Sequence, residues 1–133
     1  MNANELIHRP KGFKPLASGI EGPEGPALGP DGFMYFVSAD NATILKITHD
    51  GQISTILTLS GRPNGLAFGN EGEMYIADAG SKSILRYSGK GQPEVYTDNY
   101  DGASFSGPND ICVLEDGSLL FTDPVRLPPP DPS

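Results

Sequence analysis

The sequence contains little cysteine and little positive charge. Its single cysteine, Cys112, can form no disulfide within the chain, and no second thiol is present to help hold zinc or an iron–sulfur cluster. Nine Lys and Arg stand against 17 Asp and Glu, which gives a formal net charge of -8. Because this charge would repel phosphate backbones and anionic membrane surfaces, we expect no nucleic-acid and no membrane partner. We expect any metal site to use oxygen ligands.

Long apolar runs and helical patterns are also missing. No stretch approaches the roughly 20 apolar residues that a membrane span needs. Residues 1–15 lack the apolar region of a secretory signal, so we interpret the protein as cytoplasmic. No segment of about ten residues or more shows helical periodicity between capping residues. The sequence therefore predicts a fold made of strands.

Glycine and proline, by contrast, are abundant and recur at regular positions. Residues 23–38, 63–78 and 108–123 align without a gap, at spacings of 40 and then 45 residues. Each copy begins with proline, reaches a glycine nine residues later and continues with an apolar pair. Spacings of about 40–45 residues are typical of four-stranded propeller blades. The columns are Pro23, Pro63 and Pro108, then Gly32, Gly72 and Gly117, then the pairs that begin at Met34, Met74 and Leu119.

Each copy predicts a β-hairpin, because a short apolar strand, a turn at glycine and a second strand follow one another. Two further alternating segments complete the first two copies. The sequence thus predicts an all-β fold, a β-propeller of about two and a half four-stranded blades that cannot close a ring alone. A parallel solenoid is the less favoured alternative, because it would lack these hairpin turns. The predicted propeller region is 12–124, with blades near 20–60, 61–106 and 107–124.

The two ends of the chain fall outside the repeat. Residues 1–11 are polar and predict a flexible N-terminus. Residues 125–133 are rich in proline, which cannot donate to a sheet ladder, so we predict an extended, disordered tail. A frayed end is the favoured interpretation, and a proline-rich ligand for an aromatic groove is the alternative.

The column after each leading proline carries oxygen-bearing side chains. In a propeller these positions open the innermost strand of each blade and ring one mouth of the central channel. Hairpin pairing should return the last column of each copy to the same end. Such a cluster would suit a hard divalent cation, calcium above all. Its predicted members are Glu24, Asn64, Asp78, Asn109, Asp110 and Asp123.

Four of these residues have a structural alternative. Asn64 and Asn109 follow proline, where asparagine often caps a turn through bonds to the backbone. Asp78 and Asp123 recur at a strand end, where an aspartate can tie parts of a propeller together. Both interpretations stay open for all four residues.

Glu24 and Arg62 are the more specific candidates. Glu24 lies between Pro23 and Gly25, where it has no turn-forming role that asparagine would not fill better, so we predict that it binds metal. Arg62 lies near the predicted mouth and could bind a substrate oxygen, with a solvated loop arginine as the alternative. Cys112 occupies a position on an apolar strand that the alternation turns inward. We therefore predict that it is a small core residue.

These residues resemble the family that joins gluconolactonase with the senescence marker protein, also called regucalcin. The matching stretches are residues 21–28, 62–68 and 107–124, and the last carries a specific Pro-Asn-Asp, Asp-Gly and Phe-Thr-Asp-Pro pattern. The resemblance implies a six-bladed propeller that binds a divalent metal and hydrolyses lactones, of which this chain would be the N-terminal half. It further implies that Glu24 is the metal-binding Glu of a Glu-Gly-Pro motif and that Asn109 contacts substrate.

The expected function is a lactone hydrolase that depends on a divalent metal, calcium first, with zinc or manganese as alternatives. The family's other ligands and its general base come from later blades, so we expect weak metal affinity and little turnover from this chain alone. We predict that Glu24 binds the metal and that Asn109, Asn64 and Arg62 bind the substrate, and we assign no catalytic residue. The alternatives are a non-catalytic propeller segment that binds a partner or self-associates through its open blade edges, or a truncated gene product.

Overall fold

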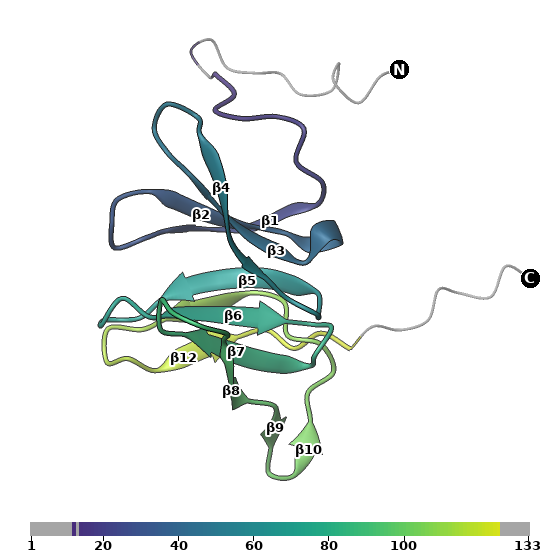
Figure 1. Cartoon of the computed structure of the whole chain (residues 1–133). Helices are drawn as coiled ribbons and strands as arrows, with labels where there is room; N and C mark the ends of the chain where they lie inside the picture. The colour runs from purple at the N-terminus through teal and green to yellow at the C-terminus, as the bar shows by residue number, and fades with distance from the viewer. Residues whose placement is uncertain (1–11, 13, 126–133) are drawn as a thin grey trace, which may run out of the picture.

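The computed structural model describes residue 12 and residues 14–125, and nearly all of its regular structure is β-strand (Figure 1). The flexible N-terminus predicted for residues 1–11 and all but Val125 of the predicted tail 125–133 lie outside the described residues. Within the described part, no helix is long and apolar enough to cross a membrane.

Two four-stranded antiparallel sheets and one hairpin follow the sequence repeat. The predicted all-β propeller fold, with an incomplete ring, is confirmed. The first sheet contains β1 (Pro23–Leu28), β2 (Met34–Ser38), β3 (Thr43–Ile47) and β4 (Ile53–Thr58) in chain order, with a short 3-10 helix, η2 (Ala39–Asn41), after β2. The second contains β5 (Pro63–Phe68), β6 (Met74–Asp78), β7 (Ser83–Tyr87) and β8 (Glu94–Thr97). The hairpins are β9 (Asn99–Tyr100) with β10 (Ala103–Ser104), and β11 (Ile111–Val113) with β12 (Leu119–Phe121).

The same tight turn joins the first two strands of each unit. The glycine of the turn has a φ of 79° at Gly32 and of 86° at Gly72 and Gly117, a region that side-chain-bearing residues rarely adopt. Its N–H donates to the carbonyl three residues earlier, at 2.9–3.0 Å in all three turns. This requirement explains why glycine occupies the same column in every copy.

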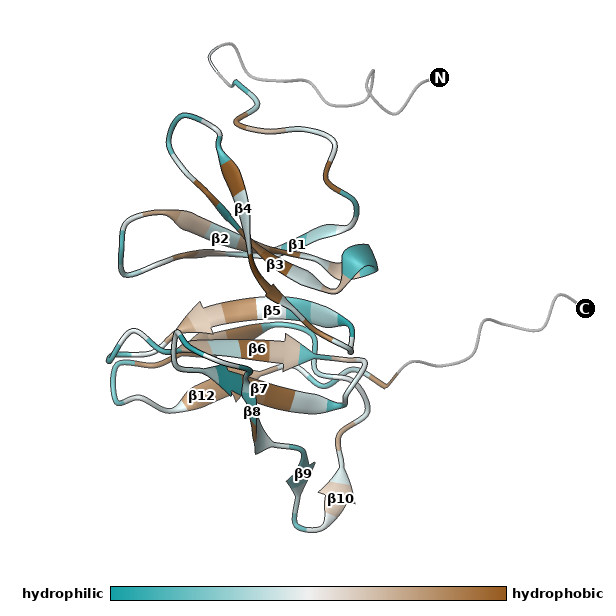
Figure 2. Cartoon of the chain, in the orientation of Figure 1, coloured by the Kyte–Doolittle hydropathy of each residue, from teal (hydrophilic) through white to brown (hydrophobic). Residues whose placement is uncertain are grey.

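Alternate side chains give each unit two faces, and the units stack through them. The side of the first sheet that carries Ala27, Tyr35, Val37 and Ile44 is called its front face. The side of the second sheet that carries Leu66, Phe68, Met74, Ile76 and Leu85 is called its back face. These two faces form one hydrophobic core, in which Val37, Ile44 and Ile76 are fully buried. Figure 2 shows the apolar strands that meet there.

The same packing occurs again one unit later. The front face of the second sheet consists of the equivalent residues Ala67, Tyr75, Ala77 and Ile84. It packs on the back face of the β11–β12 hairpin, which consists of Ile111, Val113, Leu119 and Phe121. In both described junctions, the hydrophobic core between units is therefore a front face packed on a back face.

Cys112 corrects one prediction. It belongs to the front face of the β11–β12 hairpin, and it is exposed rather than a core residue. Its equivalents Ala67 and Ala27 pack against a neighbouring unit. In the described residues no unit covers the front face of the β11–β12 hairpin, so the alternation of the strand alone did not determine burial.

An acid-sensitive contact stabilises the first hairpin. The Asp31 carboxylate accepts hydrogen bonds from Lys46 Nζ at 2.5 Å and from the Tyr35 hydroxyl at 3.0 Å. The hydrogen bond from Lys46 holds the pKa of Asp31 below its ordinary value of 3.8. A carboxyl whose pKa is lower in the folded state stabilises the fold above its unfolded pKa, and this gain is lost as the pH falls through the folded pKa.

We therefore expect Asp31→Asn to lower the free energy of unfolding modestly near neutral pH and to have no effect in strong acid. Urea unfolding at about pH 6 and at about pH 2 measures the difference. Asp101→Asn, at an exposed turn, is the control and should change neither value. An equal loss at both pH values would contradict the role of the carboxylate charge.

Candidate functional site

The innermost strands of the three units lie side by side in the order β1, β5, β11. β5 contacts both β1 and β11. The approach is closest at the third column: a Cβ added to Gly65 would lie 2.7 Å from the Asn109 carbonyl oxygen and 3.0 Å from the Asp110 Cα. A Cβ added to Gly25 would likewise clash with the Asn64 carbonyl. The glycines thus let the backbones touch, which puts the backbones of Glu24 in β1, Asn64 in β5 and Asn109 just before β11 at the same level.

Asn64 and Arg62 form a polar contact at this level. Arg62 Nη1 donates to Asn64 Oδ1 at 3.5 Å, and Arg62 Nη2 lies 4.0 Å from Asp40 Oδ1. Asp40 is in η2 of the first unit, so the arginine links two neighbouring units. The arginine side chain remains about half exposed, which leaves its guanidinium accessible to a ligand.

Asn64 also has an unused donor. The residue is 6% exposed, and its Nδ2 is buried without a hydrogen-bond partner. A buried unpaired donor costs about 1–3 kcal/mol. Its Oδ1 is directed at Arg62, so the free amide hydrogens favour an acceptor such as a carbonyl, hydroxyl or water oxygen rather than a cation. The unpaired donor of Asn64 would suit a substrate oxygen.

Glu24 and Asn109 differ from Asn64 in their surroundings. Glu24 is exposed and lines a pocket on the open side of β1 together with Pro23 and Pro26. Asn109 is half-buried just before β11, where its backbone N–H donates to the Thr122 carbonyl at 3.0 Å. The pocket that Glu24 lines is formed with Met34, Phe36 and Ile47 of the first unit and includes neither Asn64 nor Asn109.

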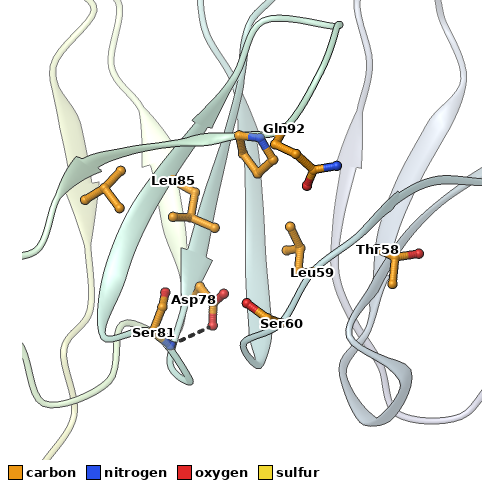
Figure 3. A pocket seen from close by; sticks show the side chains of 9 residues that line it. Thr58, Leu59, Ser60, Asp78, Ser81, Leu85 and Gln92 are labelled. Atoms are coloured by element: carbon orange, nitrogen blue, oxygen red, sulfur yellow. Dashed lines mark hydrogen bonds between the residues drawn. The ribbon is translucent and has the colours of Figure 1, made fainter.

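The wider acidic cluster expected from the repeat is not formed. Asp78 is 1% exposed, and its Oδ1 accepts from the backbone N–H groups of Arg62, Gly80 and Ser81 at 2.7–3.2 Å. Figure 3 shows its carboxylate directed at Ser81 within a pocket that Ser60 and Leu59 also line. Asp78 therefore ties the strand ends of the second unit together.

Asp123 has the same role in the third unit, where its carboxylate accepts from the N–H groups of Ser106 and Gly107 at 2.7–3.0 Å. Asp110 Oδ1 accepts from the N–H of the next residue, Ile111, at 2.9 Å. Within residues 14–125 no three His, Cys, Asp or Glu side chains gather in a way that could hold a metal ion. The carboxylates at the strand ends are used by backbone donors instead.

The side chains present have the oxygen ligands that a hard cation prefers, but there are too few of them to complete its coordination. The Glu24 carboxylate and the Asn109 amide supply the oxygen donors that calcium takes, but calcium needs six to eight of them. The described chain could hold part of such a coordination sphere, with water or further groups completing it.

Asp40 is the residue that the sequence did not point to. It approaches both Arg62 and Gly22, where an added Cβ would lie 2.8 Å from Asp40 Oδ2. The equivalent position of the second unit, 40 residues later, is Gly80, so the repeat gave no signal there. Apart from the opposite charges of Asp40 and Arg62, the sequence gave no sign of this contact.

Comparison with solved structures places the chain among the gluconolactonase-like propellers. A gluconolactonase from Xanthomonas campestris superposes with a TM-score of 0.78 and 26% identity, covering 82% of this chain and 37% of that one. A second protein, assigned to the gluconolactonases by family, gives 0.76 and 29%, covering 84% and 39%. A streptogramin B lyase gives 0.62 and 30%, covering 74% and 33%. The chain thus spans between a third and two fifths of the length of these structures.

The comparisons with sequences add no further relative. No protein-family model matches the chain, and no curated protein matches it significantly. The structural matches include both a lactonase and a lyase, so the fold alone does not choose the reaction. The two gluconolactonases superpose best of these three and agree with the resemblance seen in the sequence. The described chain is a stretch of gluconolactonase-like β-propeller.

Proposed function

We propose that this chain carries the first part of a metal-dependent lactonase site, with Glu24 as a metal ligand and Asn64, Asn109 and Arg62 around the substrate. The observation that supports it best is the row of inner strands, where glycine contacts bring Glu24, Asn64 and Asn109 to one level. The structural likeness to gluconolactonases supports the substrate class, a cyclic ester.

The chain's own residues are suited to binding rather than to proton transfer. The unpaired Asn64 Nδ2 can donate to a ring or carbonyl oxygen, and the half-exposed Arg62 guanidinium can donate to hydroxyls of a sugar lactone. Asp40, beside Arg62, keeps that guanidinium in place. A divalent cation held in part by Glu24 would, when bound, polarise the lactone carbonyl and acidify a bound water. We propose calcium as that cation, with zinc and manganese as alternatives.

Hydrolysis of a sugar δ-lactone in the presence of calcium, zinc or manganese tests the proposal. We expect slow hydrolysis above the buffer rate that a chelator abolishes, because few ligands are present. Glu24→Gln should remove at least about nine-tenths of the metal-dependent rate, a loss of about 1.4 kcal/mol or more in transition-state stabilisation.

Glu21→Gln is the matched control, since it removes the same charge from an exposed position three residues earlier. It should keep the metal-dependent rate. If the wild-type chain shows no metal-dependent rate with any of the three ions, or if both variants lose it equally, the proposed role of Glu24 is wrong.

A change at Asn64 separates binding from chemistry. We expect Asn64→Asp to raise KM at least about fivefold with little change in kcat, because the variant replaces the unpaired donor by an acceptor. Initial rates over a range of lactone concentrations measure it. Asn70→Asp, in an exposed turn at the far end of β5, is the control. A fall in kcat with an unchanged KM would contradict a role in substrate binding.

A further inference from the structure

The junction between the first and second units contains a pocket that the proposed lactonase site does not use. Its volume is about 470 Å³, which lies in the range of about 300–1,000 Å³ that is usual for small-molecule sites. All of its walls belong to residues 58–95, which run from the last strand of the first sheet to the last strand of the second. Glu24, Asn64 and Asn109 do not line it, so it is a separate site.

One oxygen of the buried Asp78 carboxylate is unused at this pocket. Its Oδ1 accepts from three backbone N–H groups, but among the described residues no group donates to its Oδ2. Figure 3 shows this second oxygen directed away from Ser81, toward the side of the pocket where Ser60 lies. The equivalent Asp123 of the third unit accepts through both of its oxygens. The second unit therefore keeps a carboxylate oxygen that can accept from a ligand.

The negative charge of Asp78 has no counterpart in this pocket. Within residues 14–125, no Lys or Arg lines the pocket and no ion pair reaches Asp78. Buried charges in proteins are as a rule paired, so a ligand with a positive charge is favoured and an anion is repelled. Asp78 is 1% exposed, so folding has already removed its water and only the ligand loses hydration on binding. A metal ion is not favoured, because no second acid lines the pocket and calcium needs six to eight oxygen ligands.

Away from Asp78 the wall of the pocket becomes apolar. Asp78 pairs with Ser83 at the start of β7, and Leu85, two residues further along β7, pairs with Val95. Leu85 and Val95 both line the pocket. Two residues along a strand span about 7 Å, the length of an alkyl chain of about five carbons. Figure 3 shows Gln92 at the far end, so the pocket has a carboxylate at one end, an apolar middle and a polar mouth.

We infer that this pocket binds a small primary alkylammonium of about five carbons, with its ammonium group on Asp78 Oδ2 and its chain against Leu85 and Val95. The hydroxyl oxygens of Ser60 and Ser81 line the same pocket and can accept the remaining ammonium hydrogens. The inference does not depend on the proposed lactonase activity, because the two sites share no residue.

Three probes of equal length that differ in head-group charge test the inference on the full chain: n-pentylammonium, 1-pentanol and pentanoate. At neutral pH n-pentylammonium should shift the backbone amide NMR signals of Ser81 and Val95. Its Kd should be at least about tenfold below that of 1-pentanol, because only the charged head forms a charge-assisted hydrogen bond with the carboxylate. Pentanoate should not bind. No shift with n-pentylammonium, or an affinity for 1-pentanol or pentanoate that equals it, would overturn the inference.

Two changes in β8 distinguish the pocket from a general attraction of cations to an acidic protein. Val95→Arg puts a positive charge on the pocket wall at a 59% exposed position and should weaken n-pentylammonium binding at least about tenfold. Tyr96→Arg is the matched control, because Tyr96 is 53% exposed and packs against Tyr75 on the front face, outside the pocket. It should keep the affinity within about twofold. Equal losses in the two variants would mean that net charge governs binding, and the inference would be wrong.

Asp78→Asn tests where the ammonium group binds. The variant keeps the shape of the side chain and removes its charge, so n-pentylammonium should lose its advantage over 1-pentanol while the affinity for 1-pentanol stays the same. Because the result is a ratio of two affinities in one protein, a modest loss of stability does not affect it, and circular dichroism checks that the variant is folded. A preference for n-pentylammonium that persists in Asp78→Asn would place the ammonium group elsewhere and contradict the inference.

Discussion

Removing the Asp78 carboxylate should produce the largest loss of stability of any change considered for this chain. Asp78 is 1% exposed, and one of its oxygens accepts from three backbone N–H groups. In Asp78→Ala those donors lose their partner, and each donor that remains buried and unpaired costs about 1–3 kcal/mol. We expect Asp78→Ala to lower the free energy of unfolding by about 3–5 kcal/mol. Urea unfolding followed by circular dichroism measures it.

Two variants distinguish the role of those hydrogen bonds from a metal-binding role. Asp78→Asn keeps an oxygen acceptor and should lose less than half as much stability. Asp123→Ala removes the equivalent carboxylate at a half-exposed position, where water can satisfy the donors, and should cost less than Asp78→Ala. If added calcium stabilised the wild type and not Asp78→Asn, Asp78 would be a metal ligand and the structural role would be wrong.

Replacing Gly65 with alanine should be nearly as damaging, by forcing the second unit away from the third. The new Cβ would lie 2.7 Å from the Asn109 carbonyl oxygen and 3.0 Å from the Asp110 Cα, both of which are backbone atoms that cannot rotate away. Overpacking of this kind typically costs about 1–3 kcal/mol. We expect the upper end of that range, with Tm lower by about 10 °C. Differential scanning calorimetry measures the change.

Gly107→Ala is the matched control for Gly65→Ala. Gly107 is also buried, but its added Cβ would lie no closer than 3.5 Å to Ala79, an ordinary contact. This variant should change Tm by no more than about 2 °C. Equal losses in the two variants would mean that general glycine replacement, and not the close approach of β5 to β11, limits stability.

The turn glycines explain why the blade pattern could be predicted from the sequence. Gly32, Gly72 and Gly117 need positive φ at one point of a tight hairpin, so the requirement is local and leaves the same mark in every copy. The alternation of apolar residues then defines two faces for each unit. Local geometry and local pattern were enough to predict the propeller.

The site was harder to predict, because it depends on the orientation of individual side chains and on their partners. Asp78 and Asp123 occupy the last column of the repeat, which the hairpin returns to the end of the unit where the mouth is expected. Their oxygens nevertheless bind backbone N–H groups of their own unit. The Asp40 to Arg62 contact joins two units outside any repeat column. Cys112 is exposed because burial of its face requires a neighbour that its own strand does not specify. Contacts within one unit decided the first outcome, and the presence or absence of a neighbouring unit decided the other two.

In the proposed site, Glu24, Asn64 and Asn109 lie at one mouth where a cation can bind. Paramagnetic broadening of asparagine side-chain amide NMR signals by Mn²⁺ tests it directly. The signals of Asn64 and Asn109 should broaden at the lowest Mn²⁺ concentration, those of Asn70 and Asn99 should not, and Glu24→Gln but not Glu21→Gln should abolish the effect. Broadening centred on other residues, or unchanged in Glu24→Gln, would contradict the claim.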